Sequence, residues 1–489
     1  MDKEATIKKV ISGFAWEGST KLIIQTLTWV STILVARILS PEDYGVVAIS
    51  GVFTGFLFIV TDMGFMSSLI NMKEVEQEDY DSVFWLNVLL SLALFILLFL
   101  MAPVLAGFYR SEVLVDIIRV SALVLPLRSL KIVPLAIAMR SMNFKYRALV
   151  EMLGQFVTAA SSIYMAYNGY GVWTLVYAVI IGQAVVAAAY LPLMKGIPAL
   201  ILNFDRIKKI VPYGMFITGS DILGFITKRS DVMIIGLFLP EKIVGYYSMG
   251  FHLATMPLDK IGALFNRVAF PAISRAKDQT PFARSLFTNM HKYLLVIAYP
   301  VLIGMAMLAE ELVVLLLTDK WLPVVPVIQA LCVLNLLRVS GMLMPFVVSG
   351  LGYAEKTFNY ALLSSIVLPI AFVVGVQFGL EGVLVGWFVA YPIFYIFLLL
   401  ILLAKLEMSV RAFLETFRSS VSCTIIMAII IYISKPYIDA GNEMLDLALL
   451  VMLGMSAYFV SYFILFKSEL LKLRNKIKEI RNGKVSKEA

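Results

Sequence analysis

Apolar runs of about twenty residues recur along nearly the whole chain, and the stretches between them are too short to fold as soluble domains. A run of that length crosses the hydrocarbon core of a bilayer as an α-helix, which satisfies its own backbone hydrogen bonds. The composition agrees, because 60% of the 489 residues are hydrophobic and only 15% are charged, whereas soluble domains carry about 25% charge. The sequence therefore predicts an all-α polytopic membrane protein.

The apolar runs predict about 14 transmembrane helices. They lie near residues 12–38, 44–69, 82–108, 113–138, 147–167, 171–194, 210–238, 243–266, 290–317, 322–350, 357–377, 380–404, 412–434 and 444–466. Basic residues concentrate in alternate loops and in the tail, roughly 25 against roughly five in the remaining loops. This asymmetry predicts a multi-pass protein of a bacterial cytoplasmic membrane with both termini in the cytoplasm. It also explains the net charge of +8 without nucleic acid as a partner.

Weak internal repeats indicate that the chain contains two related halves. The segment "LSPEDYGVVAIS" (Leu39–Ser50) aligns with "LPEKIVGYYSMG" (Leu239–Gly250), which places Gly45 opposite Gly245. Other short matches follow in the same order, at an offset that grows from 200 to 210 residues after a longer second-half loop. Four such matches in one order favour a duplicated architecture.

The repeats predict four parts of the chain. A six-helix lobe over residues 1–200 precedes a second over 201–405, followed by two additional transmembrane helices over 406–466 and a basic cytoplasmic tail over 467–489. Six helices return the chain to the same side, so the two lobes have parallel orientation. Parallel repeats of this kind build transporters whose substrate site lies between the halves near mid-membrane.

Ionisable residues inside membrane helices are costly and are functional candidates by default. Arg128 and Arg338 occupy equivalent positions in the two halves, well inside their helices, and Lys131 lies one turn from Arg128. The planar guanidinium group suits phosphate oxygens, so we predict that these residues bind an anionic substrate in a central cavity. The alternative is structural, with both arginines paired to carboxylates or helix carbonyls.

A second group of charges interrupts the apolar segment "FITKRSDVMIIG" (Phe225–Gly236). Lys228 and Arg229 are predicted to contribute to substrate binding, and Lys228 can pair with Asp231 three residues later. Lys21, in the first helix, is a further candidate cation that can pair with the acid four residues before it. The candidate acidic residues of the cavity, for charge balance or ion coupling, are Asp231, Asp221 and Glu17.

Signals for catalysis are weak. "EDYD" (Glu78–Asp81) contains an acid-x-acid pair, but such pairs are common by chance and no domain accompanies this one. The two histidines, the two cysteines in apolar runs and the lack of nucleotide-binding motifs give no metal or cofactor site. We therefore expect a protein that is not an enzyme, with no metal and no cofactor.

Several segments resemble a known family. "ILVARILSPEDYGVVA" (Ile33–Ala48) and "NGYGVWTLV" (Asn168–Val176) are similar to the first half of bacterial polysaccharide flippases, and "SDVMIIGLFLPEKIVGYYS" (Ser230–Ser248) and "TDKWLPVVPVIQ" (Thr318–Gln329) to the second half. The resemblance is to the lipopolysaccharide, colanic-acid and teichuronic-acid exporter branch of the multidrug/oligosaccharidyl-lipid/polysaccharide (MOP) superfamily. It covers at least residues 7–405.

The resemblance implies alternating-access translocation of an undecaprenyl-(pyro)phosphate-linked oligosaccharide across the cytoplasmic membrane for cell-surface polysaccharide biosynthesis. Its expected partners are that substrate, membrane lipids and glycosyltransferases or a polymerase of the same pathway, and we expect a monomer. One alternative is a cation-coupled multidrug exporter of the same superfamily, which would need acidic cavity residues. Another is a membrane-embedded polysaccharide polymerase, which would need a large external loop.

Overall fold

The computed structural model describes residues 3–194, 196, 198–467 and 469. The side chain of the candidate Glu17 lies outside the described residues, as does the tail beyond residue 469. The described residues form α-helices and short 3-10 helices, and no β-strand occurs among them. The all-α prediction is thereby confirmed.

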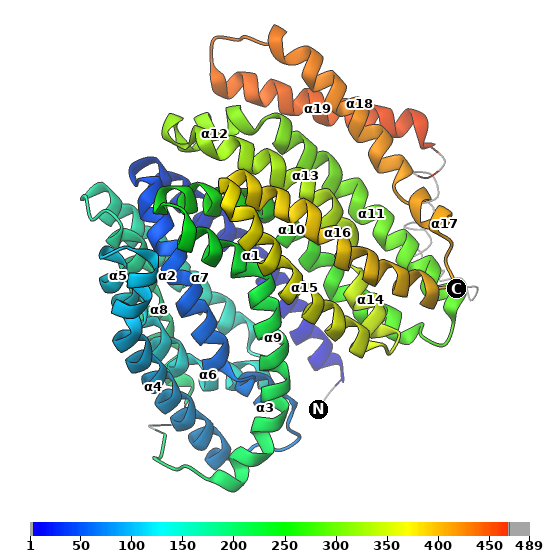
Figure 1. Ribbon diagram of the computed structural model, residues 1–489. Helices are drawn as coiled ribbons and strands as arrows, with labels where there is room; N and C mark the ends of the chain where they lie inside the picture. Colours follow the sequence, from blue (N-terminus) through cyan, green and yellow to red (C-terminus); the bar gives the residue numbers. More distant parts are fainter. Residues whose placement is uncertain (1–2, 195, 197, 468, 470–489) are drawn as a thin grey trace. The chain divides into compact units, whose positions relative to one another are not determined.

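The helices follow one another with short connections (Figure 1). Up to residue 238 they are α1 (Lys3–Ile38), α2 (Pro41–Asp62), α3 (Phe65–Asn71), α4 (Gln77–Tyr109), α5 (Val113–Ser121), α6 (Val124–Arg140), α7 (Phe144–Tyr167), α8 (Trp173–Tyr190), η1 (Leu191–Leu193) and α9 (Phe204–Phe238). The remainder are α10 (Glu241–Arg275), α11 (Thr280–Met307), α12 (Ala309–Leu317), η2 (Asp319–Val324), α13 (Val325–Gly341), α14 (Met344–Gly350), α15 (Ala354–Gly375), η3 (Val376–Phe378), α16 (Gly379–Lys405), α17 (Val410–Glu415), α18 (Arg418–Ser434), η4 (Lys435–Tyr437) and α19 (Glu443–Leu465).

Each stretch predicted to span the membrane falls on helix, although several are broken into two. The break between α2 and α3 occurs at Met63 and Gly64, whose φ angles of 37° and 62° are left-handed and cannot continue an α-helix. Ten helical segments among the described residues are long and apolar enough to cross a membrane, one of them the 52-residue segment Ala354–Lys405. The number fourteen stays a prediction.

The chain forms two compact units, Met1–Ser248 and Met249–Ala489, whose boundary falls inside α10. In the first unit Phe65, Leu69 and Val133 are buried in an apolar cluster that joins α3, α4 and α6. In the second unit α18 and α19 run side by side (Figure 1), and the buried Tyr458 contributes to their shared core. The division of the chain at residue 200, which rests on the repeats, remains a prediction.

The first turns of α2 and α10 meet in a reciprocal glycine contact within the first unit. A methyl group on Gly45 would lie 1.9 Å from the carbonyl oxygen of Glu241. A methyl group on Gly245 would lie 1.8 Å from the carbonyl oxygen of Pro41. Only glycine permits backbones to approach so closely. The two glycines that the sequence alignment paired are therefore in mutual contact.

The same relation appears in an ion pair beside the glycines. Lys242 Nζ lies 3.3 Å from Glu42 Oε1, and the two residues are 200 positions apart, like the glycines. Both side chains are about half exposed, so the pair contributes little stability by itself. The contact between α2 and α10 therefore has an ion pair at its edge and the two closely packed glycines at its centre.

Candidate functional site

Arg128, on α6, lines a cavity of about 290 Å³ inside the first unit. Its guanidinium carbon lies 3.6 Å above the centre of the Phe58 ring, a close cation–π contact. Its Nε is buried and has no hydrogen-bond partner among the described residues. The other lining residues come mainly from α2, α6 and α8 and include the hydroxyl-bearing Ser50 and Thr54. Arg128 therefore keeps hydrogen-bonding capacity unused inside a membrane-spanning helix, which suits an anion-binding role.

Lys131 is held by a carboxylate instead. Its Nζ lies 3.7 Å from Glu151 Oε1 on α7, and its side chain is only 13% exposed. The hydroxyl of Tyr190 donates to the same carboxylate oxygen at 3.4 Å. This is the kind of carboxylate pairing that the structural alternative assigned to the two arginines, and here it links α6 to α7 through Lys131. Its predicted role in substrate binding remains a prediction.

Arg338, on α13, stacks on aromatic rings of the second unit. Its guanidinium carbon lies 5.3 Å from the ring centre of Trp387 and 5.6 Å from that of Phe251. Its Nη1 donates to Asn335 Oδ1 at 3.1 Å, and the amide of Asn335 donates to the Ala254 carbonyl at 2.9 Å. Asn335 is fully buried and so fixes the orientation of the guanidinium.

The two arginines thus share a local environment as well as an equivalent position. Arg128 rests on one aromatic ring and Arg338 on two, each within its own unit, and neither arginine forms an ion pair with a carboxylate among the described residues. The carboxylate pairing expected under the structural alternative is therefore not seen there. Their convergence on one central cavity remains a prediction.

The charges of α9 separate into two groups. Asp231 is buried, with 1% of its surface exposed. Its Oδ2 accepts a hydrogen bond from the hydroxyl of Tyr247 at 2.6 Å, and its Oδ1 one from the backbone N–H of Val232 at 2.7 Å. Asp231 therefore connects α9 to α10, whereas Lys228 and Arg229 are exposed.

The remaining candidate residues of the cavity are not part of the hydrogen bond between Tyr247 and Asp231. Asp221 and Lys21 are exposed on α9 and α1. Asp62, at the end of α2, lies within electrostatic range of Asp221 and Arg128. The assignments of Asp221, Lys21 and Glu17 to a cavity remain predictions.

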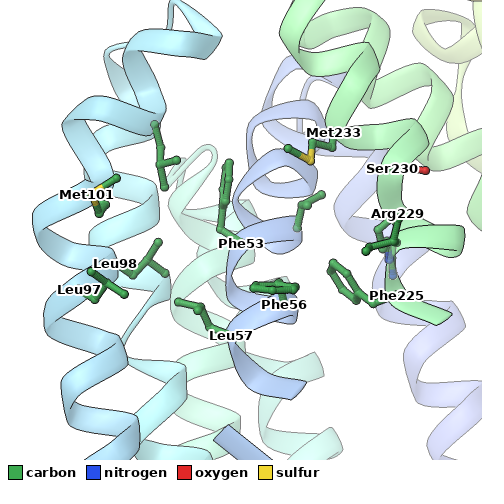
Figure 2. A pocket seen from close by; sticks show the side chains of 13 residues that line it. Phe53, Phe56, Leu57, Leu97, Leu98, Met101, Phe225, Arg229, Ser230 and Met233 are labelled. Carbon is green, nitrogen blue, oxygen red and sulfur yellow. The ribbon is translucent and has the colours of Figure 1, made fainter. Parts of the chain in front are cut away.

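An apolar cavity of about 370 Å³ lies between α2, α4 and α9 of the first unit (Figure 2). Figure 2 shows Phe53, Phe56 and Leu57 of α2 between the leucines of α4 and the side of α9. On the α9 side the lining includes Phe225, Ile226, Arg229, Ser230 and Met233. We call this cavity the groove. The sequence did not predict it, because its lining residues come from three separate segments that each have the composition of an ordinary membrane helix.

The acid-x-acid pair is structural. Arg206, at the start of α9, forms ion pairs with Glu76 at 2.6 Å, Asp79 at 3.0 Å and Glu78 at 3.3 Å. Its hydrogen bonds to Asp79 and Glu76 raise the pKa of its guanidinium above the usual value. Asp79 and Asp81 are both almost fully buried. Glu76, Glu78 and Asp79 thus anchor the start of α9 to the start of α4. The described residues contain no group of three His, Cys, Asp or Glu side chains that could hold a metal ion.

One buried polar cluster in the second unit was also missed by the sequence analysis. His291 is fully buried and stacks on Phe287 and Phe413. Its Nδ1 lies 2.9 Å from Thr416 Oγ1, and its Nε2 lies 3.3 Å from Ser340 Oγ. Both ring nitrogens are satisfied, so the imidazole joins α11 to α13 and to the turn after α17.

Solved structures with similar folds are transporters of lipids and drugs. A lipid II flippase, MurJ, in an inward closed conformation superposes with a TM-score of 0.74 at 15% identity, covering 93% of this chain and 99% of its own. An inward-facing multidrug resistance MATE transporter of the MOP superfamily gives a TM-score of 0.62 at 15% identity, covering 79% of this chain and 96% of its own. At these identities the likeness establishes the fold alone.

Relatives identified by sequence are proteins of surface polysaccharide synthesis. The teichuronic acid biosynthesis protein TuaB of Bacillus subtilis (strain 168) is 26% identical over 343 residues, covering 68% of this chain and 69% of its own. The lipopolysaccharide biosynthesis protein WzxC of Escherichia coli (strain K12) is 23% identical over 393 residues, covering 78% of each chain. The sequence model of polysaccharide biosynthesis proteins matches residues 34–326, more than half of the chain. The protein belongs to the polysaccharide biosynthesis protein family.

Proposed function

We propose that the protein flips an undecaprenyl-(pyro)phosphate-linked oligosaccharide across the bacterial cytoplasmic membrane by alternating access, as a step in cell-surface polysaccharide biosynthesis. The family membership and the flippase-like fold support the substrate class. The observation that carries the proposal is Arg128, whose buried Nε has no hydrogen-bond partner in the described part of the chain and whose guanidinium rests on Phe58 in a cavity between membrane helices.

The chemistry of this cation fits a phosphate group. An unpaired arginine in a membrane is costly unless it faces a cavity or a counter-charge. A (pyro)phosphate supplies both the charge and the planar pairs of oxygens that a guanidinium binds bidentately. Arg338 offers a second guanidinium in the equivalent position of the other repeat, oriented by Asn335. Two such groups would hold the head of the carrier while the sugars occupy the aqueous cavity.

The proposal also covers the topology, the conformational change, the oligomeric state and the pathway partners of the protein. Both termini would lie in the cytoplasm, the two six-helix repeats would rock against each other, and the protein would act as a monomer. Glycosyltransferases and a polymerase of the same pathway would supply and consume its lipid-linked substrate. The alternative of a cation-coupled drug exporter is less well supported, since the matching sequence model and relatives are named for polysaccharide, teichuronic acid and lipopolysaccharide biosynthesis.

The test is flipping in proteoliposomes loaded with undecaprenyl-pyrophosphate-linked oligosaccharide. The Arg128→Ala/Arg338→Ala double variant should flip at least about tenfold more slowly, since charge-assisted bonds to phosphate are lost. Arg411→Ala serves as the matched control, because Arg411 has a 91% exposed side chain in α17. Normal flipping by the double variant would contradict the role of these arginines.

A further inference from the structure

The groove between α2, α4 and α9 combines an apolar lining with one charged side chain. Apart from Arg229 and Ser230, the side chains that line it carry no polar group. Its volume of about 370 Å³ lies in the range of ligand pockets, about 300–1,000 Å³. Figure 2 shows Arg229 beside Phe225 on the α9 side of the groove. A ligand for this site must therefore be mainly hydrocarbon.

The groove opens onto apolar surface of α4. Leu97 and Met101 line it, and they are 51% and 39% exposed. Leu100, on the same helix, does not line the groove and is 68% exposed. Because α4 is long and apolar enough to span a membrane, this exposed face is suited to contact lipid. A hydrocarbon chain can therefore enter the groove from the bilayer without crossing water.

Arg229 places a cation next to this hydrocarbon site. The residue is exposed, and among the described residues no carboxylate forms an ion pair with it. It lies nine residues before the end of α9 at Phe238, a distance of about 14 Å at 1.5 Å per residue. The sequence predicts that α9 crosses the membrane, and a cation so far from the end of a membrane helix requires a counter-charge or water. Its aliphatic stem can form part of the groove wall while the guanidinium extends beyond it.

We propose that this groove binds the phosphate-proximal part of the polyprenyl chain of the lipid carrier, and that Arg229 binds the carrier phosphate. The proposal rests on the proposed function and assigns the carrier's lipid part to a site of its own.

The lining distinguishes the carrier from ordinary phospholipid. In a polyprenyl phosphate the hydrocarbon chain is bonded directly to the phosphate, so a cation at the groove wall can bind the head while the chain fills the groove. In a phospholipid the glycerol and its two esters separate the phosphate from the acyl chains. Those polar groups would be buried among carbon side chains with few hydrogen-bond donors, which is unfavourable.

Binding of undecaprenyl phosphate to the purified full-length protein tests the proposal, with flipping of the complete substrate measured on the same preparations. Leu97→Trp fills the groove, whereas Leu100→Trp adds the same bulk to the same helix outside it. We expect Leu97→Trp and Arg229→Ala each to weaken binding by about tenfold. Leu100→Trp should bind as the wild type does, and Arg229→Lys should retain part of the affinity because it keeps the charge.

The outcomes separate the two levels of the proposal. If Leu97→Trp binds and flips as well as Leu100→Trp, the groove assignment is wrong while flipping by the wild type still stands. If phosphatidylglycerol displaces undecaprenyl phosphate at equal concentration, the occupant is ordinary phospholipid and the assignment is also wrong. If the wild type neither binds undecaprenyl phosphate nor flips the substrate, the proposed function fails together with the groove. Variants are compared only as monodisperse preparations, so that misfolding does not imitate a loss of binding.

Discussion

Replacing Gly45 or Gly245 by alanine should destabilise the protein through the reciprocal contact between α2 and α10. The added methyl group would lie 1.9 Å from the carbonyl oxygen of Glu241 in the first variant and 1.8 Å from that of Pro41 in the second. Ordinary van der Waals contact begins at 3.4 Å. The two helix starts must therefore separate by about 1.5 Å, and backbone atoms cannot move aside as a flexible side chain can.

Two opposing contributions determine the size of the effect. Overpacking a tight contact typically costs about 1–3 kcal/mol. Replacing glycine by alanine inside a helix returns about 0.5–1 kcal/mol, because glycine loses more backbone entropy on folding. Since the clashing atoms are backbone, we expect a net loss of about 1–2 kcal/mol in the free energy of unfolding for either variant. The ion pair between Glu42 and Lys242 adds little to this value, because both side chains are about half exposed.

Thermal unfolding of the purified protein in detergent measures this loss, with Gly51→Ala as the control. Gly51 belongs to the same helix as Gly45, but a methyl group there would meet nothing within 4 Å. Gly51→Ala should be as stable as the wild type or slightly more stable. The Gly45→Ala/Gly245→Ala double variant should cost less than the sum of the single variants, because either alanine alone already separates the helices. Equal stability of Gly45→Ala and Gly51→Ala would refute the close contact.

Two further predictions concern the connections of α9. Tyr247→Phe should lower the free energy of unfolding by about 1–3 kcal/mol, because it removes a hydroxyl that donates to the buried carboxylate of Asp231. Thermal unfolding measures this loss, and an unchanged stability would mean that another partner is sufficient for the carboxylate. Arg206→Ala should lower the melting temperature in low salt and less so in high salt, because it removes ion pairs to Glu76 and Asp79 that salt screens. A difference from the wild type that salt leaves unchanged would argue against an electrostatic origin.

Much of the fold followed from hydrophobic run lengths, since a membrane helix needs about twenty apolar residues whatever its neighbours. The repeat alignment paired Gly45 with Gly245, but an alignment does not predict contact, and the close approach of the two backbones emerges only from the structure. The hydrogen bond between Tyr247 and Asp231 could not be predicted from the sequence. The sequence offers Lys228 at helical spacing from Asp231, whereas Tyr247 lies 16 residues away on another helix. Local spacing predicts neighbours on one helix face and says nothing about the helix that packs on it.

The groove between α2, α4 and α9 could not be predicted from the sequence, for a related reason. Its walls come from α2, α4 and α9, and each contributes side chains that any membrane helix would carry. A cavity results from how side chains of different helices fail to fill a shared space, which depends on packing and leaves no periodic signal. Only Arg229 was conspicuous, because its charge is unusual in an apolar segment.

The asymmetry of the two repeats acquires a physical meaning from these contacts. At the equivalent place in the first repeat α1 carries Thr28–Ser31, where α9 carries Lys228, Arg229 and Asp231. Asp231 is buried and accepts a hydrogen bond from the hydroxyl of Tyr247, whereas Lys228 and Arg229 are exposed. The exposed side chains in this part of α9 therefore carry a net positive charge. The aligned segment of α1, Thr28–Ser31, carries no charge. We infer that Arg128 and Arg338 provide a grip common to both repeats, and that α9 alone adds the cation which decides how the lipid end of the carrier is held.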